Sequence, residues 1–266
     1  MEFIKRTLTA IVLLVFIYFL AVKSTPLVFF LVLQAVIYLA LYELLNLVEL
    51  KNEYKLIISI YAILISYYFF TKKLSIDTIL LTMILASGIV LLKRTDKETL
   101  KNFSSNYAKL IFIPFYLVFT LNFLFYIWKV SYLHLFFLIL IISVGDSAAY
   151  FIGSWIGKHK MFPVASPKKS VEGFIASIVF SILAAYLASL TFYKMFPPDF
   201  ILISGVLIPL VAQLSDPVES LFKRATGVKD SSNILPGHGG FLDRIDSYIF
   251  AAPVFFLLIR YFTLIK

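Results

Sequence analysis

A polar segment closes a long apolar stretch near the C-terminus and reads SDPVESLFKR from residue 215 to residue 224. Its charged residues Asp216, Glu219 and Lys223 are spaced by three and by four, so a helix places them on one face. An acid at membrane depth costs about 2.5–3.5 kcal/mol, so two acids need a cation, a metal or a water-filled cavity. The alternative is a Glu219–Lys223 salt bridge at the membrane interface, with Asp216 reaching toward the lipid headgroups.

The loop that follows, residues 229–247, reads KDSSNILPGHGGFLDRIDS. Asp243 and Asp246 are three residues apart at the start of an expected helix, so they face the same way. Paired carboxylates suit Mg²⁺, which is usually bound by a few carboxylates together with phosphate oxygens. Three glycines around His238 allow close backbone approach to a ligand and positive φ. A Gly-rich turn with an Asp cap and an Asp243–Arg244 surface pair is the alternative, but the nearby acids favour a metal and phosphate site.

A third polar cluster lies between residues 145 and 173. Asp146 interrupts an apolar helix, and Lys168 and Lys169 precede Ser170, which is predicted to cap the next helix. A helix N-terminus beside two lysines can bind an anion. The alternative is an ordinary cytoplasmic loop, which Asp146 argues against.

Composition places the chain in a bilayer. Hydrophobic residues make up 61% of it, charged residues 15%, and the mean hydropathy is +0.94. The absence of cysteine excludes disulfides and thiolate chemistry. The net charge of +9 comes from short loops, which favours anionic lipid headgroups over nucleic acid as the partner.

We predict an all-α, polytopic membrane protein with nine spans. Residues 1–107 form an N-terminal membrane region of four helices and residues 108–266 a catalytic membrane domain of five. On this topology, 17 of the 24 basic residues lie on the side of the N-terminus. The positive-inside rule therefore places the N-terminus and the polar cavity on the cytoplasmic side. The predicted spans are 7–22, 26–46, 55–71, 74–92, 108–128, 131–157, 171–195, 199–223 and 244–264.

The stretch from Ser220 to Asp246 reads S-x-F-K-R-x4-K-D-x-S-x2-L-P-G-H-G-G-F-x-D-R-I-D and resembles the signature of phosphatidate cytidylyltransferases. The segments D-S-A-A-Y-F-I-G-x3-G-K and S-P-K-K-S-x-E-G, upstream of it, are also similar to that family. The resemblance implies Mg²⁺-dependent transfer of CMP from CTP to phosphatidic acid. It also implies a homodimer in the cell (inner) membrane, with the active site facing the cytoplasm.

On this hypothesis, the carboxylates of Asp216, Asp243 and Asp246 bind one or two cations, of which one is Mg²⁺. Basic side chains hold phosphate oxygens, and His238 contacts a phosphate or moves a proton. The predicted catalytic residues are Asp216, Lys223, Arg224, Lys229, Asp230, His238, Asp243, Arg244 and Asp246. The predicted substrate-binding residues are Asp146, Lys168, Lys169, Ser170, Glu219, Gly237, Gly239 and Gly240.

Other functions fit some of these features. A transporter also carries polar residues in its spans, but such proteins tend to show internal repeats, and none is visible here. A CTP-dependent lipid kinase, or a cytidylyltransferase acting on another lipid phosphate, would use the same kind of site. The product separates these, because a kinase releases CDP whereas a cytidylyltransferase releases pyrophosphate. A purely structural membrane protein would not need so many charges clustered at one face.

Overall fold

Helices form nearly all of the chain in a computed structural model, which describes residues 2–48, 50–92, 100–191, 196–232, 234 and 239–264. The predicted site residues Gly237 and His238 lie outside the described residues. In chain order the helices are α1 (Glu2–Lys23), α2 (Pro26–Leu47), α3 (Asn52–Thr71), α4 (Ile76–Leu92), α6 (Phe103–Ile113), η1 (Pro114–Phe119), α7 (Thr120–Val130), α8 (Tyr132–Ile156), α9 (Val171–Thr191), α10 (Pro198–Ala225) and α11 (Leu242–Leu264).

Among the described residues, seven helical segments are long and apolar enough to cross a membrane, which indicates a multi-pass membrane protein. They correspond to the predicted spans except the first and the fourth. In those two places the apolar helical stretches with described side chains are shorter: Leu14–Lys23, which is the second half of α1, and Ile76–Leu92. The count of nine, the side of the N-terminus and the cytoplasmic position of the cavity stay predictions.

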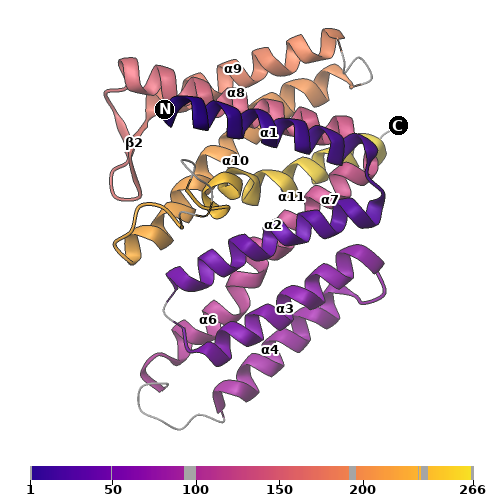
Figure 1. The fold of residues 1–266 in the computed structure, drawn as a ribbon, viewed down its shortest axis with the longest axis vertical. Coiled ribbons are helices and arrows are strands. Elements are labelled where there is room, and N and C mark those ends of the chain that lie inside the picture. The colour runs from indigo at the N-terminus through magenta and orange to yellow at the C-terminus, as the bar shows by residue number, and fades with distance from the viewer. Residues whose placement is uncertain are drawn as a thin grey trace.

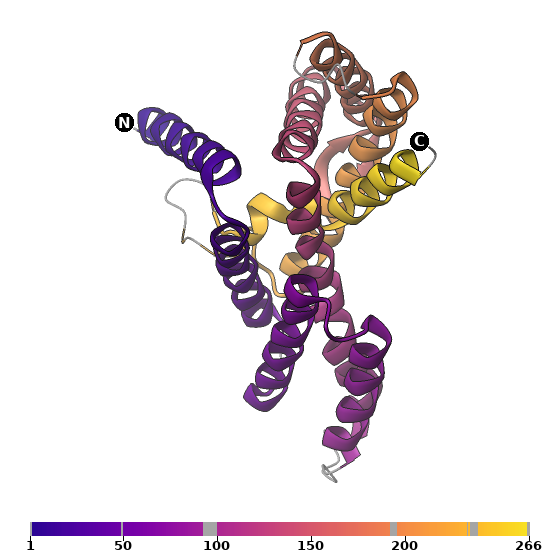
Figure 2. The same ribbon diagram turned by 90° about the vertical axis from the view of Figure 1, so that its right-hand side faces the viewer.

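The helices form two groups joined by a central layer. Helices α3, α4 and α6 lie together at one end, α8 and α9 lie at the other, and α2, α7 and α11 run between them (Figure 1). Helix α1 stands to one side (Figure 2). One apolar cluster joins α2, α3 and α6 to Leu242 and Ile249 of α11, and a second joins α7, α8, α10 and α11. The first cluster thus contains residues from both sides of the predicted boundary at 107/108.

A π-helical turn divides the span that runs from Phe103 to Val130. It begins at Pro114, whose ring nitrogen cannot donate to the preceding turn. Because π-helical turns disturb the regular hydrogen-bond ladder, side chains supplement it here. Asn122 donates to the carbonyl of Val118 over 2.8 Å, and Thr120 donates to that of Leu117 over 3.2 Å.

The predicted loop between α8 and α9 contains a short antiparallel hairpin, so the fold is nearly but not entirely α. Strands β1 (Lys160–Phe162) and β2 (Ser166–Ser170) pair Lys160 with Ser170 and Phe162 with Ser166. Lys160–Phe162 is too short to show the alternating pattern from which a strand is predicted, and Ser166–Ser170, with the sequence SPKKS, does not alternate between apolar and polar side chains. The hairpin leads directly into α9.

Candidate active site

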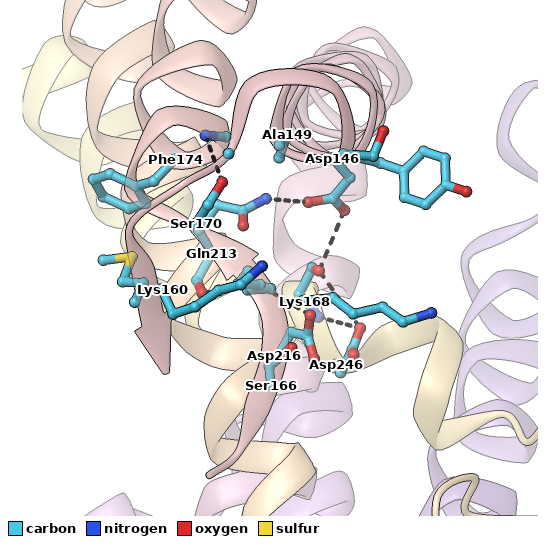
Figure 3. Close-up of a pocket in the computed structure, with 18 of the residues that line it drawn as sticks. Asp146, Ala149, Lys160, Ser166, Lys168, Ser170, Phe174, Gln213, Asp216 and Asp246 are labelled. Atoms are coloured by element: carbon cyan, nitrogen blue, oxygen red, sulfur yellow. Dashed lines mark hydrogen bonds and ion pairs between the residues drawn. The ribbon is translucent and has the colours of Figure 1, made fainter. Parts of the chain in front are cut away.

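A cavity of about 620 Å³ lies between the hairpin and helices α8, α9, α10 and α11. Asp146 from α8, Asp216 from α10 and Asp246 from α11 line it (Figure 3). The hairpin contributes Lys160, Lys168 and Lys169 to the lining. The cavity therefore brings acids from three helices and basic side chains from the hairpin to one space.

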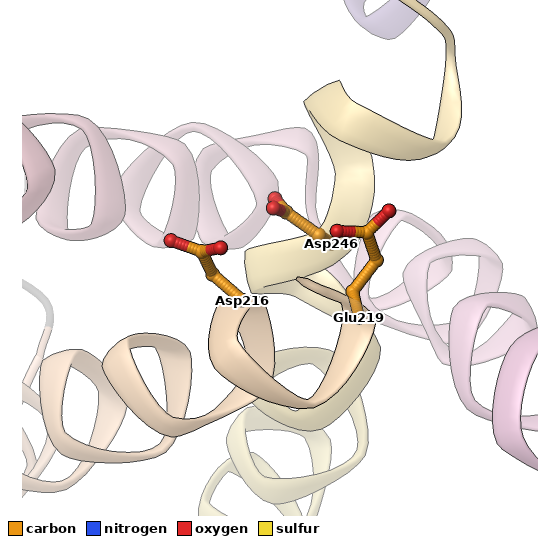
Figure 4. A group of neighbouring side chains, drawn as sticks. All are labelled: Asp216, Glu219 and Asp246. Atoms are coloured by element: carbon orange, nitrogen blue, oxygen red, sulfur yellow. The ribbon is translucent and has the colours of Figure 1, made fainter. Parts of the chain in front are cut away.

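Three carboxylates form the most compact acidic group among the described residues. Oxygen atoms of Asp216, Glu219 and Asp246 all lie within 4.8 Å of one another (Figure 4). Asp216 and Glu219 share a face of α10, as their spacing predicted, and Asp246 comes from the neighbouring α11. Glu219 is fully buried, and no described residue donates a hydrogen bond to its Oε1. A buried acceptor with no donor fits a cation ligand.

Lys223 lies between two acids. Its Nζ is 2.6 Å from Oε2 of Glu219 and 2.6 Å from Oδ1 of Asp243, and only 8% of its side chain is exposed. The Glu219–Lys223 salt bridge, proposed from sequence as the alternative to a functional site, is thus present together with the three-acid group. Asp243 forms this ion pair and also lines the cavity, while Glu219 joins Asp216 and Asp246 in the compact group; the role of Asp243 as a cation ligand stays a prediction.

Lys169 is fixed by a break in the helix opposite. Pro217 has no backbone N–H, so the carbonyl of Gln213, four residues earlier, loses its partner within α10. Nζ of Lys169 donates to that carbonyl over 3.1 Å and lies 2.9 Å from Oδ2 of Asp216. The Asp-Pro pair in the sequence therefore creates both the acceptors that hold this lysine.

Asp146 is held by a side chain that sequence analysis did not identify. Nε2 of Gln213 donates to its Oδ1 over 2.7 Å, and Oγ of Ser247 lies 3.4 Å from its Oδ2. Gln213 is three residues before Asp216 on the same face of α10, and this spacing was the available signal. Ser247 and Gln213 both line the cavity. Asp146 thus belongs to a polar network rather than to the three-acid group.

The described part of the Gly-rich loop bonds to carboxylates of the protein itself. The amide of Gly240 donates to Oδ2 of Asp243 over 2.8 Å, and the amide of Ser231 donates to the same atom over 3.0 Å. Gly239 has a φ of +80°, which confirms positive φ at one of the predicted glycines. Asp243 therefore turns back to cap its own loop, as one sequence alternative held, and it pairs with Lys223.

Comparison with known proteins covers nearly the whole chain. Residues 4–262 match the model of the cytidylyltransferase family. A protein named phosphatidate cytidylyltransferase from Staphylococcus haemolyticus (strain JCSC1435) is 36% identical over 263 residues, which are 96% of this chain and 98% of that protein. The chain belongs to the cytidylyltransferase family.

Two further relatives of this cytidylyltransferase-family chain match over a shorter stretch. A phosphatidate cytidylyltransferase from Bacillus subtilis (strain 168) is 42% identical over 130 residues, 49% of this chain and 48% of that protein. One from Staphylococcus aureus (strain COL) is 48% identical over 121 residues, 45% of this chain and 46% of that protein. These two alignments span about half the length of the relatives.

The hairpin positions two further residues of the family-like motifs. Ser170 caps α9 as predicted, because its Oγ accepts from the amide of Gly173 over 3.2 Å. Glu172, in the first turn, accepts from the backbone amide of His159 and lies 2.6 Å from Nδ1 of its ring. These contacts tie both ends of the hairpin to α9, next to the cavity that Lys168 lines.

Four other predicted site residues do not line the cavity. Arg224, Lys229, Asp230 and Arg244 are exposed and do not line it. Arg224 donates from Nη1 to the carbonyl of Val228 over 3.1 Å, within the turn that follows α10. Their predicted roles with phosphate stay predictions.

Proposed function

We propose that the chain is a Mg²⁺-dependent phosphatidate cytidylyltransferase that transfers CMP from CTP to phosphatidic acid. The observation that carries this proposal is the three-acid group of Asp216, Glu219 and Asp246 beside a cavity lined with lysines. Membership of the cytidylyltransferase family and the names of the relatives support the same reaction. Acids that can hold a cation and lysines that can hold phosphate oxygens lie in one cavity, which suits two phosphate-bearing substrates.

The residues fit a divalent cation. Five carboxylates, those of Asp146, Asp216, Glu219, Asp243 and Asp246, lie in this region, and among the described residues two lysine ammonium groups, those of Lys169 and Lys223, form ion pairs with them. If all are ionised, an excess of three negative charges remains in a mostly buried volume. Carboxylate oxygens are ligands that Mg²⁺ prefers. The donor set therefore suits one or two cations.

In the proposed reaction, a phosphate oxygen of phosphatidic acid attacks the α-phosphorus of CTP. A new P–O bond forms, the bond between the α-phosphorus and the oxygen that bridges it to the β-phosphorus breaks, and pyrophosphate leaves with that electron pair. The attacking oxygen is already an anion, so the protein needs no strong base. A bound Mg²⁺ would supply charge neutralisation at the phosphates.

The lysines of the chain have separable roles in this proposal. Lys160 and Lys168, on the hairpin, reach the cavity and would hold phosphate oxygens as mobile point charges. Lys169 is fixed by Asp216 and by the carbonyl of Gln213, so it would stabilise charge at one defined place. Lys223 is buried between acids and would set the position of Glu219.

Orientation, membrane and assembly follow the sequence prediction: a homodimer in the cell (inner) membrane, with the cavity facing the cytoplasm. Because the chain has no cysteine, single introduced cysteines report their side without background. We expect Lys158→Cys, beside the hairpin, to react with an impermeant maleimide only in inverted vesicles. Lys72→Cys, between α3 and α4, should react only in right-side-out cells. The opposite labelling pattern would overturn the orientation.

A two-label assay tests the reaction itself. Purified protein in mixed micelles is given phosphatidic acid, Mg²⁺ and CTP labelled with ³²P at either the α or the γ position. Cytidylyl transfer moves the α label into the lipid phase and leaves the γ label in pyrophosphate. A lipid kinase would give the reverse pattern. No labelled lipid from either nucleotide, with folded protein, would overturn the proposed function.

A further inference from the structure

An acid in the N-terminal half of the chain contacts the loop at the candidate active site. Glu43 lies near the end of α2 and is only 2% exposed. Its hydrogen-bond partners are 188 to 199 residues away in the sequence. A buried acid with such distant partners joins two parts of the fold that local sequence patterns do not connect.

Both oxygens of Glu43 accept two hydrogen bonds each. Oε1 accepts from Oγ of Ser232 over 2.6 Å and from the amide of Phe241 over 3.0 Å. Oε2 accepts from Oγ of Ser231 over 2.9 Å and from the amide of Leu242 over 2.8 Å. The carboxylate thus binds one end of the Gly-rich loop and also the first turn of α11.

The position of this carboxylate accounts for its burial. The amides at the start of a helix have no partner within the helix and carry the positive end of its dipole. Glu43 occupies that end of α11 by accepting from Phe241 and Leu242. Charge-assisted bonds of this kind are stronger than neutral ones, and they compensate for the loss of water.

A packed junction connects Glu43 to Asp243. Oγ of Ser231 lies 2.9 Å from Glu43 and 3.0 Å from Asp243, and its single proton can be donated to only one of them at a time. Gly240 packs between these groups, because a Cβ there would overlap Ser231 and come within 2.5 Å of Glu43. The junction has no room for a side chain at that position.

We infer that Glu43 is a positioning residue for the proposed cytidylyl transfer, and this inference rests on that proposed function. It fixes the first turn of α11, where Leu242 is fully buried and Asp243 follows directly. Asp246 lies one turn further along the same helix, within 4.8 Å of the other two acids. A shift or rotation of this turn would separate Asp246 from its group. Among the described residues, the four hydrogen bonds of Glu43 reach neither the cavity lining nor the three acids.

The test compares Glu43→Gln with Gln34→Leu. Glutamine keeps the shape but replaces one acceptor oxygen with a donor that faces two donors. Gln34 is a matched control, because it is buried on the same helix and hydrogen-bonded to Asn122 and Ser66, away from the loop. Both variants remove buried hydrogen bonds of α2, so both are expected to lower thermal stability.

Only Glu43→Gln should change the site. We expect kcat to fall about 100-fold, the effect of misplacing a group by about 1 Å, with KM for CTP changing less than threefold. Half-activation by Mg²⁺ should require more cation, and amide hydrogen exchange should rise in peptides covering residues 239–248. Ser232→Ala, which removes one donor to Glu43, should give the same changes in weaker form and serves if Glu43→Gln does not fold.

Two results would overturn the inference. One is unchanged exchange in residues 239–248 in a folded Glu43→Gln or Ser232→Ala protein. The other is an equal change in exchange and Mg²⁺ requirement in Gln34→Leu, which would reduce Glu43 to a stabilising residue. Since exchange is measured without substrate, it tests whether Glu43 holds the first turn of α11 even if wild-type protein makes no CDP-lipid, so failure of this inference and failure of the proposed function can be told apart.

Discussion

Replacing Asp246 with asparagine should raise the stability of the cation-free protein while removing its response to Mg²⁺. The three acids lie within 4.8 Å of one another. At an effective dielectric constant of about 20, two charges at that separation repel by about 3 kcal/mol. Asp246→Asn removes two of the three pairwise repulsions and keeps the side-chain shape. Single stabilising substitutions commonly add about 0.5–2 kcal/mol, and we expect a net gain of this size.

Mg²⁺ should reverse the order of stability. A cation that binds only the folded protein, at about 100 times its Kd, adds about 2.7 kcal/mol. This corresponds to a rise in Tm of roughly 5–11 °C. Wild type should gain this stabilisation, because its three carboxylates together bind the ion. Asp246→Asn, with one carboxylate ligand fewer, should gain little.

Thermal unfolding in detergent, with EDTA or with Mg²⁺, measures both effects. Asp243→Asn is the matched control, because Asp243 lies on the same helix but pairs with Lys223 at 2.6 Å. This control should keep most of the Mg²⁺-induced rise in Tm. An equal rise in wild type and Asp246→Asn would refute the three-acid group as the cation site. Loss of the rise in Asp243→Asn alone would favour Asp243 over Asp246 as a ligand.

Three further substitutions test the contacts around the cavity. Lys223→Met leaves two buried acids without their partner and should lower the free energy of unfolding by about 3–5 kcal/mol, measured by thermal unfolding. Adding Glu219→Gln should recover part of this loss. A loss below about 1 kcal/mol would contradict the buried ion pair. Lys169→Met should lower kcat/KM roughly 10- to 150-fold, which corresponds to the loss of a charge-assisted bond of about 1.5–3 kcal/mol. Unchanged steady-state kinetics would show that Lys169 takes no part in the reaction. Gly240→Ala should destabilise the protein by about 1–3 kcal/mol through overpacking. Gly88→Ala is the control and should not, because the nearest neighbouring atom to an added Cβ there is in Tyr107, 3.9 Å away. Equal melting temperatures of the two variants would contradict the packed junction.

Local spacing predicted much of the site. Intervals of three and four placed Asp216, Glu219 and Lys223 on one face of a helix, and the structure confirms this. The cap at Ser170 was also predicted from its neighbours, and the bond from the amide of Gly173 confirms it. Long apolar runs likewise predicted the seven helices that can span a membrane. Each of these inferences depends only on residues within a few turns of one another.

Contacts between distant segments were beyond such patterns. Glu43 and Gln213 are ordinary polar residues in apolar helices, and only the packing of α2 against α11 and of α10 against α8 gives them partners. The spacing of Asp243 and Asp246 predicted a shared direction, and both line the cavity, but the bonds of Asp243 to Gly240 and Lys223 come from tertiary contacts. Which acid joins a cluster was therefore decided by tertiary contacts, which periodicity does not encode.

The central claim is cytidylyl transfer at the three-acid group of Asp216, Glu219 and Asp246. The most direct test supplies α-³²P-CTP and phosphatidic acid and follows the label into the lipid product. It is run for wild type and for Asp246→Asn, with Mg²⁺ or with EDTA. We predict a labelled CDP-lipid from wild type with Mg²⁺, and none with EDTA or from the variant. Equal labelling by the variant, or labelling that survives EDTA, would contradict the claim.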